Sequence, residues 1–316
     1  MLFERNVAIA EWRECRIARP PTDKEGDTPK FSFTSLDLSK NQILKMKITL
    51  SILILLVIIL FFLSKNFENQ YFDDVKKYLS ETDFTENDLL STSDIQHLPV
   101  PVQKYLKLTG SINKPKVKNV KIAFEGQMRF KGEDWFSFTS EQYNFFDNPA
   151  RFFFMKGKVK GIPTNGYHKY SGNRACMDIR LLSLIPVVKK GDLFRVETVT
   201  LFNDMCILAP ATLVNENITW REIAPNRCEA TFTNKDVSIK SILYFNNEGE
   251  LINFTSDDRD DTSPESPKRF STPLKNYDTI NGHYLAHYGE AIWHYPEGKF
   301  VYGKFNVVDV KYNVSD

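Results

Sequence analysis

The stretch VKNVKIAFEGQMRFKGEDWFSFTSEQYN, residues 117–144, decides the fold class. Apolar and polar side chains alternate along 120–130 and again along 136–142, which is the two-residue period of a strand with one buried face. The sequence GEDW, 132–135, separates the two runs and is typical of a turn. We therefore predict an antiparallel hairpin, because two strands joined by a short turn pair in opposite directions.

The same alternation recurs over most of the chain after residue 116. Further strands are expected at 151–160, 167–178, 218–224, 228–233, 237–245, 250–256, 277–279, 284–293 and 299–312. Together with the first hairpin they make about ten strands, and the turn signals between them favour an antiparallel meander.

Residues 179–209 interrupt the alternation. An apolar run with a break at Pro186 is followed by Asp192, which we expect to cap a helix that extends to Met205. The acidic stretch 257–267 is expected to be a solvated loop. The sequence therefore predicts an α+β, mainly β fold, with one large, curved, half-barrel-like antiparallel sheet and a helical insert.

The N-terminal part contains one long apolar run, Ile48–Leu63, which has no charged residue. At about 1.5 Å of rise per residue, it is barely long enough to cross the hydrocarbon core of a bilayer as a helix. No A-x-A cleavage pattern follows it, so we favour a transmembrane anchor at 46–65 over a cleaved signal peptide. Lys45 and Lys47 precede it, which favours a cytoplasmic N-terminus and places the chain from about residue 66 outside the cytoplasm.

The segments on either side of this run differ in character. Residues 1–45 show no periodicity, so they are either disordered or an extension that is absent if translation starts at Met46. Residues 66–115 are expected to be a helical segment and linker, with a short helix at Val102–Leu108. The remainder, 116–316, is expected to be one β-rich extracytoplasmic domain.

Composition and motifs exclude several function classes. The net charge is +1 with acidic and basic residues interspersed, whereas nucleic-acid binding needs a basic surplus. The sequence has no G-x-S-x-G elbow, Walker loop or GxGxxG motif, so we assign no catalytic residue and no cofactor. Cys176, Cys206 and Cys228 do not have zinc-site spacing, and we assign no metal site.

Weaker constellations of reactive side chains also occur. His283 and His287 can share a strand face, with His294 and His168 as further ligands, and Cys176 with His168 can be written as a dyad. A glycosidase would need two carboxylates across a cleft. The candidate carboxylates are Glu125, Glu133, Asp134, Glu141 and Asp178. For all these groups we favour structural or solvent-exposed roles.

Arg129 and Gln142 are polar residues in strands that are otherwise aromatic. If those strand faces point inward, both would be polar anchors in an apolar cavity, which is how ligand pockets are commonly built. If the faces point outward, both meet solvent. With Trp135, Phe138 and Phe154 they form the candidate ligand-binding set.

Four segments occur in a recognisable order: LPVPVQKYLKLTG at 98–110, FEGQMRF at 124–130, DWFSFTSEQYN at 134–144 and FFFMKGKVKGIP at 152–163. This order resembles DUF6544, a family of bacterial membrane-associated proteins of unknown function. The resemblance implies a short apolar N-terminus, an LP-x-PVQRYL helix and a β-rich body. Lys104 stands where the family pattern has arginine. No catalytic residue is implied.

The order sheet, helical insert, sheet also resembles the LolA/LolB-like half-barrel of lipoprotein carriers, whose concave side holds acyl chains. That resemblance implies an apolar or lipid-like ligand beneath the sheet. We therefore predict a non-enzymatic, membrane-anchored binding protein. Two alternatives remain open: a hydrolase-type enzyme with a cleft of His, Asp and Glu side chains, and an envelope structural or interaction protein with an exposed apolar patch.

Overall fold

The computed structural model describes residues 39–84, 88–261 and 267–315. The chain divides into two units, residues 1–52 and 53–316. The predicted N-terminal extension lies mostly outside the described residues, so both interpretations of it stay predictions.

The first helix, α1 (Lys40–Glu81), contains the whole apolar run Ile48–Leu63. In its most apolar window the mean hydropathy is 2.9 and no residue is buried. The helix is therefore long and apolar enough to cross a membrane. Met46 lies within its second turn, and the helix continues without interruption into the predicted helical segment 66–115 as far as Glu81.

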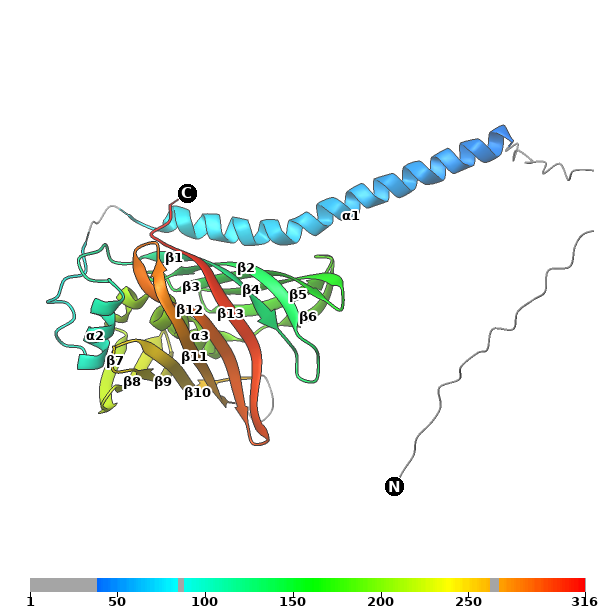
Figure 1. Cartoon of the computed structure of the whole chain (residues 1–316). Coiled ribbons are helices and arrows are strands. Elements are labelled where there is room, and N and C mark those ends of the chain that lie inside the picture. Colours follow the sequence, from blue (N-terminus) through cyan, green and yellow to red (C-terminus); the bar gives the residue numbers. More distant parts are fainter. Residues whose placement is uncertain (1–38, 85–87, 262–266, 316) are drawn as a thin grey trace, which may run out of the picture. The chain divides into compact units, whose positions relative to one another are not determined.

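Thirteen strands form one unclosed antiparallel sheet in the described part of the chain (Figure 1). They are β1 (Asn119–Met128), β2 (Phe136–Phe145), β3 (Ala150–Val159), β4 (Ile162–Ser171), β5 (Arg174–Leu181), β6 (Ile185–Lys190), β7 (Ile218–Ala224), β8 (Arg227–Asn234), β9 (Val237–Phe245), β10 (Leu251–Arg259), β11 (Lys268–Ile280), β12 (His283–Tyr295) and β13 (Gly298–Tyr312). The predicted fold class is confirmed.

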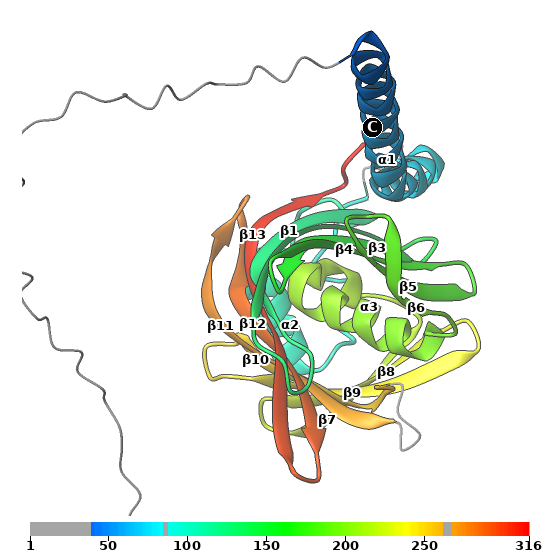
Figure 2. The ribbon, with the colours of Figure 1, turned by 90° about the vertical axis from the view of Figure 1, so that its right-hand side faces the viewer.

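The sheet consists of two meanders joined in the middle. Strands β1 to β6 form one meander and β7 to β13 the other, and β13 pairs with β1, so β6 and β7 are the two edges. Helix α3 (Phe194–Leu208) and the 3-10 turn η1 (Pro210–Leu213) connect these edges. Because long sheets twist and coil, this one curves around α3, which lies inside the curve (Figure 2).

The largest difference from the sequence prediction lies before α3. The run predicted as an interruption forms β6 and the end of β5. Pro186 is tolerated because β6 is an edge strand, where a missing N–H group removes no ladder bond. Asp192 does not cap α3, since its φ is +58° and the N-cap position is Leu193.

The strand boundaries also differ toward the C-terminus. β10 reaches Arg259 and β11 begins at Lys268, so the first three residues of the predicted loop 257–267 belong to β10. Residues 262–266 lie outside the described part. β11 also begins nine residues before the strand predicted at 277–279, because it pairs with β12 from Arg269 onward and a partner strand overrides local sequence preference.

The short helix α2 (Val100–Leu108) confirms the prediction at Val102–Leu108 and starts two residues earlier. Pro101 lies in the first turn, where its missing N–H is not needed, and Gly110 follows the end with φ +67°. The Tyr105 hydroxyl donates to the backbone carbonyl of Cys206, 2.9 Å away, and so attaches α2 to the last turn of α3.

The two faces of the sheet carry separate clusters of buried side chains. The inner face packs on α3 and α2 and forms the larger core. On the outer face, Phe67 and Tyr71 of α1 pack against Phe154 and Tyr167 with ring centres 5.4 to 5.7 Å apart. The Tyr71 hydroxyl also donates to Glu141 at 3.0 Å. The part of α1 that follows the apolar run is therefore packed against the sheet.

Candidate functional site

A cavity of about 230 Å³ lies between the inner face of the sheet and α3. Its apolar wall includes Phe124, Met128, Phe153, Met177, Leu274 and Phe305. Its polar side includes Gln142, Arg151, His168, Asn203, Asp204 and Arg259. An apolar space with a few convergent polar groups is the usual form of a small-molecule site.

Helix α3 supplies two buried carboxylates, of which Asp204 lines the cavity and Glu197 lies next to it. Glu197 and Asp204 are seven residues apart, which is about two helical turns, so both project from the same face. All of α3 from Val196 onward is buried except Thr200, so these acids lie where a charge needs compensation.

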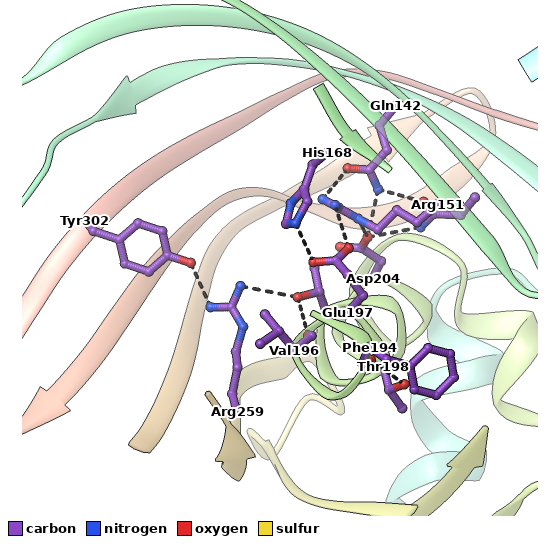
Figure 3. A network of polar contacts seen from close by, with 12 residues as sticks. Gln142, Arg151, His168, Phe194, Val196, Glu197, Thr198, Asp204, Arg259 and Tyr302 are labelled. Atoms are coloured by element: carbon purple, nitrogen blue, oxygen red, sulfur yellow. Dashed lines mark hydrogen bonds and ion pairs between the residues drawn. The ribbon is translucent and has the colours of Figure 1, made fainter. Parts of the chain in front are cut away.

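Arg151 on β3 provides that compensation (Figure 3). Its Nε donates to Asp204 Oδ2 at 2.9 Å, and its Nη1 donates to Glu197 Oε2 at 3.3 Å. Only 7% of Arg151 is exposed, and the two neighbouring carboxylates raise the pKa of its guanidinium against the opposing effect of burial. Arg151 therefore ties the sheet to the helix inserted within it.

Two amides of β2 complete this polar cluster. Gln142 Nε2 donates to Asp204 Oδ2 at 2.7 Å, and its Oε1 accepts from Arg151 Nη2 at 2.8 Å. Asn144 Nδ2 also donates to Asp204 Oδ2, at 3.0 Å. Three donors converge on one carboxylate oxygen, and charge-assisted bonds of this kind are the strong ones.

His168 on β4 lies beside Glu197, with 3.1 Å between His168 Nε2 and Glu197 Oε1 (Figure 3). Burial lowers the pKa of His168 below its ordinary value, and Arg151 and Arg259 lower it further, while Glu197 opposes the shift. The imidazole is therefore neutral at pH 7.

Lowering the pH from 7 to 5 is expected to reduce the free energy of unfolding, in part through His168. Its pKa is lower in the folded protein, so the unfolded chain binds more protons as the pH falls through about 6.5. His168→Gln should remove this contribution and lessen the pH slope by at most ~1.4 kcal/mol per pH unit. Urea unfolding at several pH values measures the slope, and an unchanged slope in the variant would contradict the assignment.

Arg259 at the end of β10 lies on another side of the cavity. Its Nη1 donates to the Tyr302 hydroxyl at 2.8 Å and its Nη2 to Thr200 Oγ1 at 3.2 Å (Figure 3). Its guanidinium carbon lies 4.1 Å from the ring centre of Phe270 and 5.0 Å from that of Trp293. It is thus held by neutral oxygens and aromatic faces.

The structure separates the five predicted ligand-binding residues. Gln142 lines the cavity, and Phe138 lies in the adjoining core with its ring centre 5.3 Å from that of Phe305. Trp135 and Arg129 lie at the β1–β2 turn, where the guanidinium stacks over the indole at 4.4 Å.

Phe154 lies on the opposite face of the sheet from Gln142. It faces the outer side of the sheet and packs beneath α1, so it does not line the cavity. Trp135 and Phe138 instead border a separate, open groove of about 1430 Å³ at the β1–β2 and β3–β4 turns.

The weaker constellations are not assembled. Cys176 is exposed and pairs with Lys169, so it lies on the opposite face of the sheet from His168. His283 stacks edge-on against Tyr312, and His294 contacts Ser271. In the described residues, no three His, Cys, Asp or Glu side chains are grouped closely enough to hold a metal ion.

The candidate carboxylates lie apart from the cavity. Glu141 pairs with Lys121 on the outer face, Glu133 pairs with Lys160, and Asp178 pairs with Arg180. Glu125 and Asp134 border the open groove. They are held in ion pairs or exposed at the groove.

A model of a family of unknown function, DUF6544, matches residues 88–305. The chain belongs to the DUF6544 family. All four segments that carried the resemblance fall within the matched region, and the family model gives no activity.

Among solved structures, a LolA superfamily protein from Nitrosomonas europaea is similar with a TM-score of 0.43 and 12% identity, covering 69% of this chain and 96% of that one. No curated protein matches the chain.

The central residues of the DUF6544 cavity were missed by sequence reasoning. Arg151, Glu197, Asp204 and Arg259 come from elements far apart in the chain, so no local motif joins them. One signal was available: Glu197 and Asp204 are acids two turns apart in a helix whose other residues are mostly apolar. Acids on such a helix indicate a buried basic partner.

Proposed function

We propose that this DUF6544 protein is a single-pass, membrane-anchored protein that binds a lipid or another apolar molecule between its curved sheet and α3. The cavity is the observation that carries this proposal. Its volume of about 230 Å³ exceeds the ~150 Å³ of an engineered apolar cavity that takes up benzene. Phenylalanine, methionine and leucine side chains form much of its wall.

The apolar part of α1 supports the membrane location. Its side chains are exposed to the surroundings, whereas the following segment, from Phe67 to Leu79, buries an aromatic and aliphatic face. With more lysines before the apolar run than immediately after it, the proposed topology has a cytoplasmic N-terminus and an extracytoplasmic β-rich domain.

Binding is favoured over hydrolysis by the state of the polar groups. Glu197 and Asp204 are both held by Arg151, so neither is poised as a free general base. The described lining residues include no cysteine or serine that could act as a nucleophile. The open groove at the β1–β2 turn has ion-paired lysines and acids but no convergent catalytic group.

Filling the cavity tests the proposal. The full-length protein, purified from membranes in a mild detergent, is expected to retain an apolar molecule that organic extraction and mass spectrometry detect. Ala286→Phe places a ring in the cavity lining and should reduce the retained amount at least several-fold, at a stability cost of about 1–3 kcal/mol.

The matched control is Ala123→Phe. Ala123 pairs with Glu141, whose side chain is on the outer face, so the added ring avoids the cavity. This variant should retain the apolar molecule in the natural amount. Equal retention by both variants, or no retained molecule in the natural protein, would overturn the proposal.

A further inference from the structure

Arg259 differs from the other buried arginine of the cavity. Arg151 contacts two carboxylates, whereas within the described residues the hydrogen bonds of Arg259 go to the neutral oxygens of Tyr302 and Thr200. Arg259 is only 8% exposed, and among the residues that the structure describes no carboxylate lies within ion-pair distance of it. A buried charge without a counter-ion is costly, so this position favours an anion.

Further polar atoms of the same cavity also lack a partner in the described structure. Arg259 Nε is buried and donates to no protein group, and the Thr272 hydroxyl and Asn203 Oδ1 are likewise unpartnered. All three residues line the cavity and are nine-tenths or more buried. Buried polar groups are normally hydrogen-bonded, so these atoms mark the position of a polar ligand group.

The negative charge already present in the cavity does not serve Arg259. Of the two carboxylates that line the cavity, Asp204 accepts from Arg151, Gln142 and Asn144. The other, Glu290, accepts from the Tyr288 hydroxyl at 2.7 Å. Glu197, buried next to the cavity, pairs with Arg151 and lies beside His168. Among the described residues, none of these carboxylates forms an ion pair with Arg259. Arg259 projects from β10, in a different meander from Arg151.

We propose that Arg259 binds the singly charged oxyanion headgroup of an amphiphile, a carboxylate or a phosphodiester, whose apolar chain lies along the cavity wall. This rests on the proposed function and names the ligand class. A guanidinium N–H fork matches a carboxylate or phosphate oxygen pair. The free Thr272 hydroxyl supplies a further donor, and Phe124, Met128 and Phe305 contact the chain.

Matched probes test the headgroup separately from the chain. The full chain in lipid nanodiscs is titrated separately with carboxyl-labelled decanoate and with decan-1-ol, which has the same chain length. The signal from the same titration of empty nanodiscs is subtracted from each. The natural protein is expected to bind decanoate at least about ten-fold more tightly than the alcohol, because hydrogen bonds to a charged group are stronger than those between neutral groups. A decyl phosphodiester forms the third arm, and the tighter of the two anions identifies the headgroup.

Arg259→Gln should remove the preference for the anion by lowering decanoate affinity about ten-fold while leaving binding of the alcohol nearly unchanged. Removing an unpaired buried charge is not expected to destabilise the fold, which urea unfolding checks. Arg221→Gln is the control, because Arg221 lies exposed on the edge strand β7 and pairs with Glu229 of the neighbouring strand β8.

The outcomes separate the two proposals. Binding of neither probe would overturn the proposed function itself. Equal binding of decanoate and decan-1-ol by the natural protein, or an unchanged preference in Arg259→Gln, would leave apolar binding intact and overturn the assignment of Arg259.

Discussion

Replacing Arg151 by methionine is expected to lower the free energy of unfolding by about 3–5 kcal/mol. Methionine is long and neutral, so the main loss is electrostatic. Glu197 is fully buried and Asp204 nearly so, and the substitution leaves both without their cationic partner. Urea unfolding of the full-length protein in detergent, followed by tryptophan fluorescence, measures the effect.

Two comparison variants make this result specific. Arg269→Met removes an exposed ion pair with Asp257 and should change stability by no more than about 1 kcal/mol. A triple variant with Arg151→Met, Glu197→Gln and Asp204→Asn removes the charges together and should recover much of the loss. A cost for Arg151→Met no larger than that for Arg269→Met would show that the cluster does not hold α3 in the sheet.

Replacing Tyr71 by alanine is expected to release α1 from the outer face of the sheet. Tyr71 is 1% exposed, and its ring contacts Phe154 and Tyr167. Loss of a large buried aromatic side chain typically costs about 3–5 kcal/mol. Because this cluster is separate from the inner core, the loss should appear as local opening, measured by faster hydrogen exchange in the segment from Phe67 to Leu79.

The next residue along the helix provides the control. Phe72 is 49% exposed, so Phe72→Ala should leave hydrogen exchange in this segment nearly unchanged. Tyr71→Phe removes only the hydrogen bond to Glu141 and should cost about 0.5–1.5 kcal/mol. If Tyr71→Ala and Phe72→Ala behave alike, the packing of α1 on the sheet is not as the structure shows.

The fold class was predictable because its signals are local. The alternation along 120–130 and 136–142 predicts a hairpin in any context that buries one face, and it forms β1 and β2. The helix at Val102–Leu108 is marked by Pro101 and Gly110 at its ends. Ile48–Leu63 would be apolar on every side of a helix, and such a helix is stable only in a membrane or in the interior of a large protein.

The errors arose where tertiary contacts override local preference. The run containing Pro186 was interpreted as a break because proline is rare in strands, yet an edge strand tolerates it. β11 begins at Lys268 because β10 and β12 pair with it, and nothing in its own sequence requires that start. Pairing partners remote in the chain decide such boundaries.

The site residues show the same division. Gln142 was identified because a polar side chain in an aromatic strand is visible in the sequence, but its partner Asp204 lies 62 positions away. Phe154 carries the same aromatic signal and faces the other side of the sheet. Two-residue alternation shows that successive side chains of a strand point to opposite faces of the sheet. It does not show which of the two faces is covered by α3.

The sequence by itself determined the apolar run, the antiparallel strands and the presence of a helical insert, since each depends on periodicity within a few residues. Only the tertiary structure decided that the insert lies inside the sheet. The curvature of the sheet brings β3 and β10, from separate meanders, to opposite sides of α3. Arg151 is thereby paired with buried acids, whereas Arg259 has no acidic partner among the residues that the structure describes. This difference depends on proximity in space.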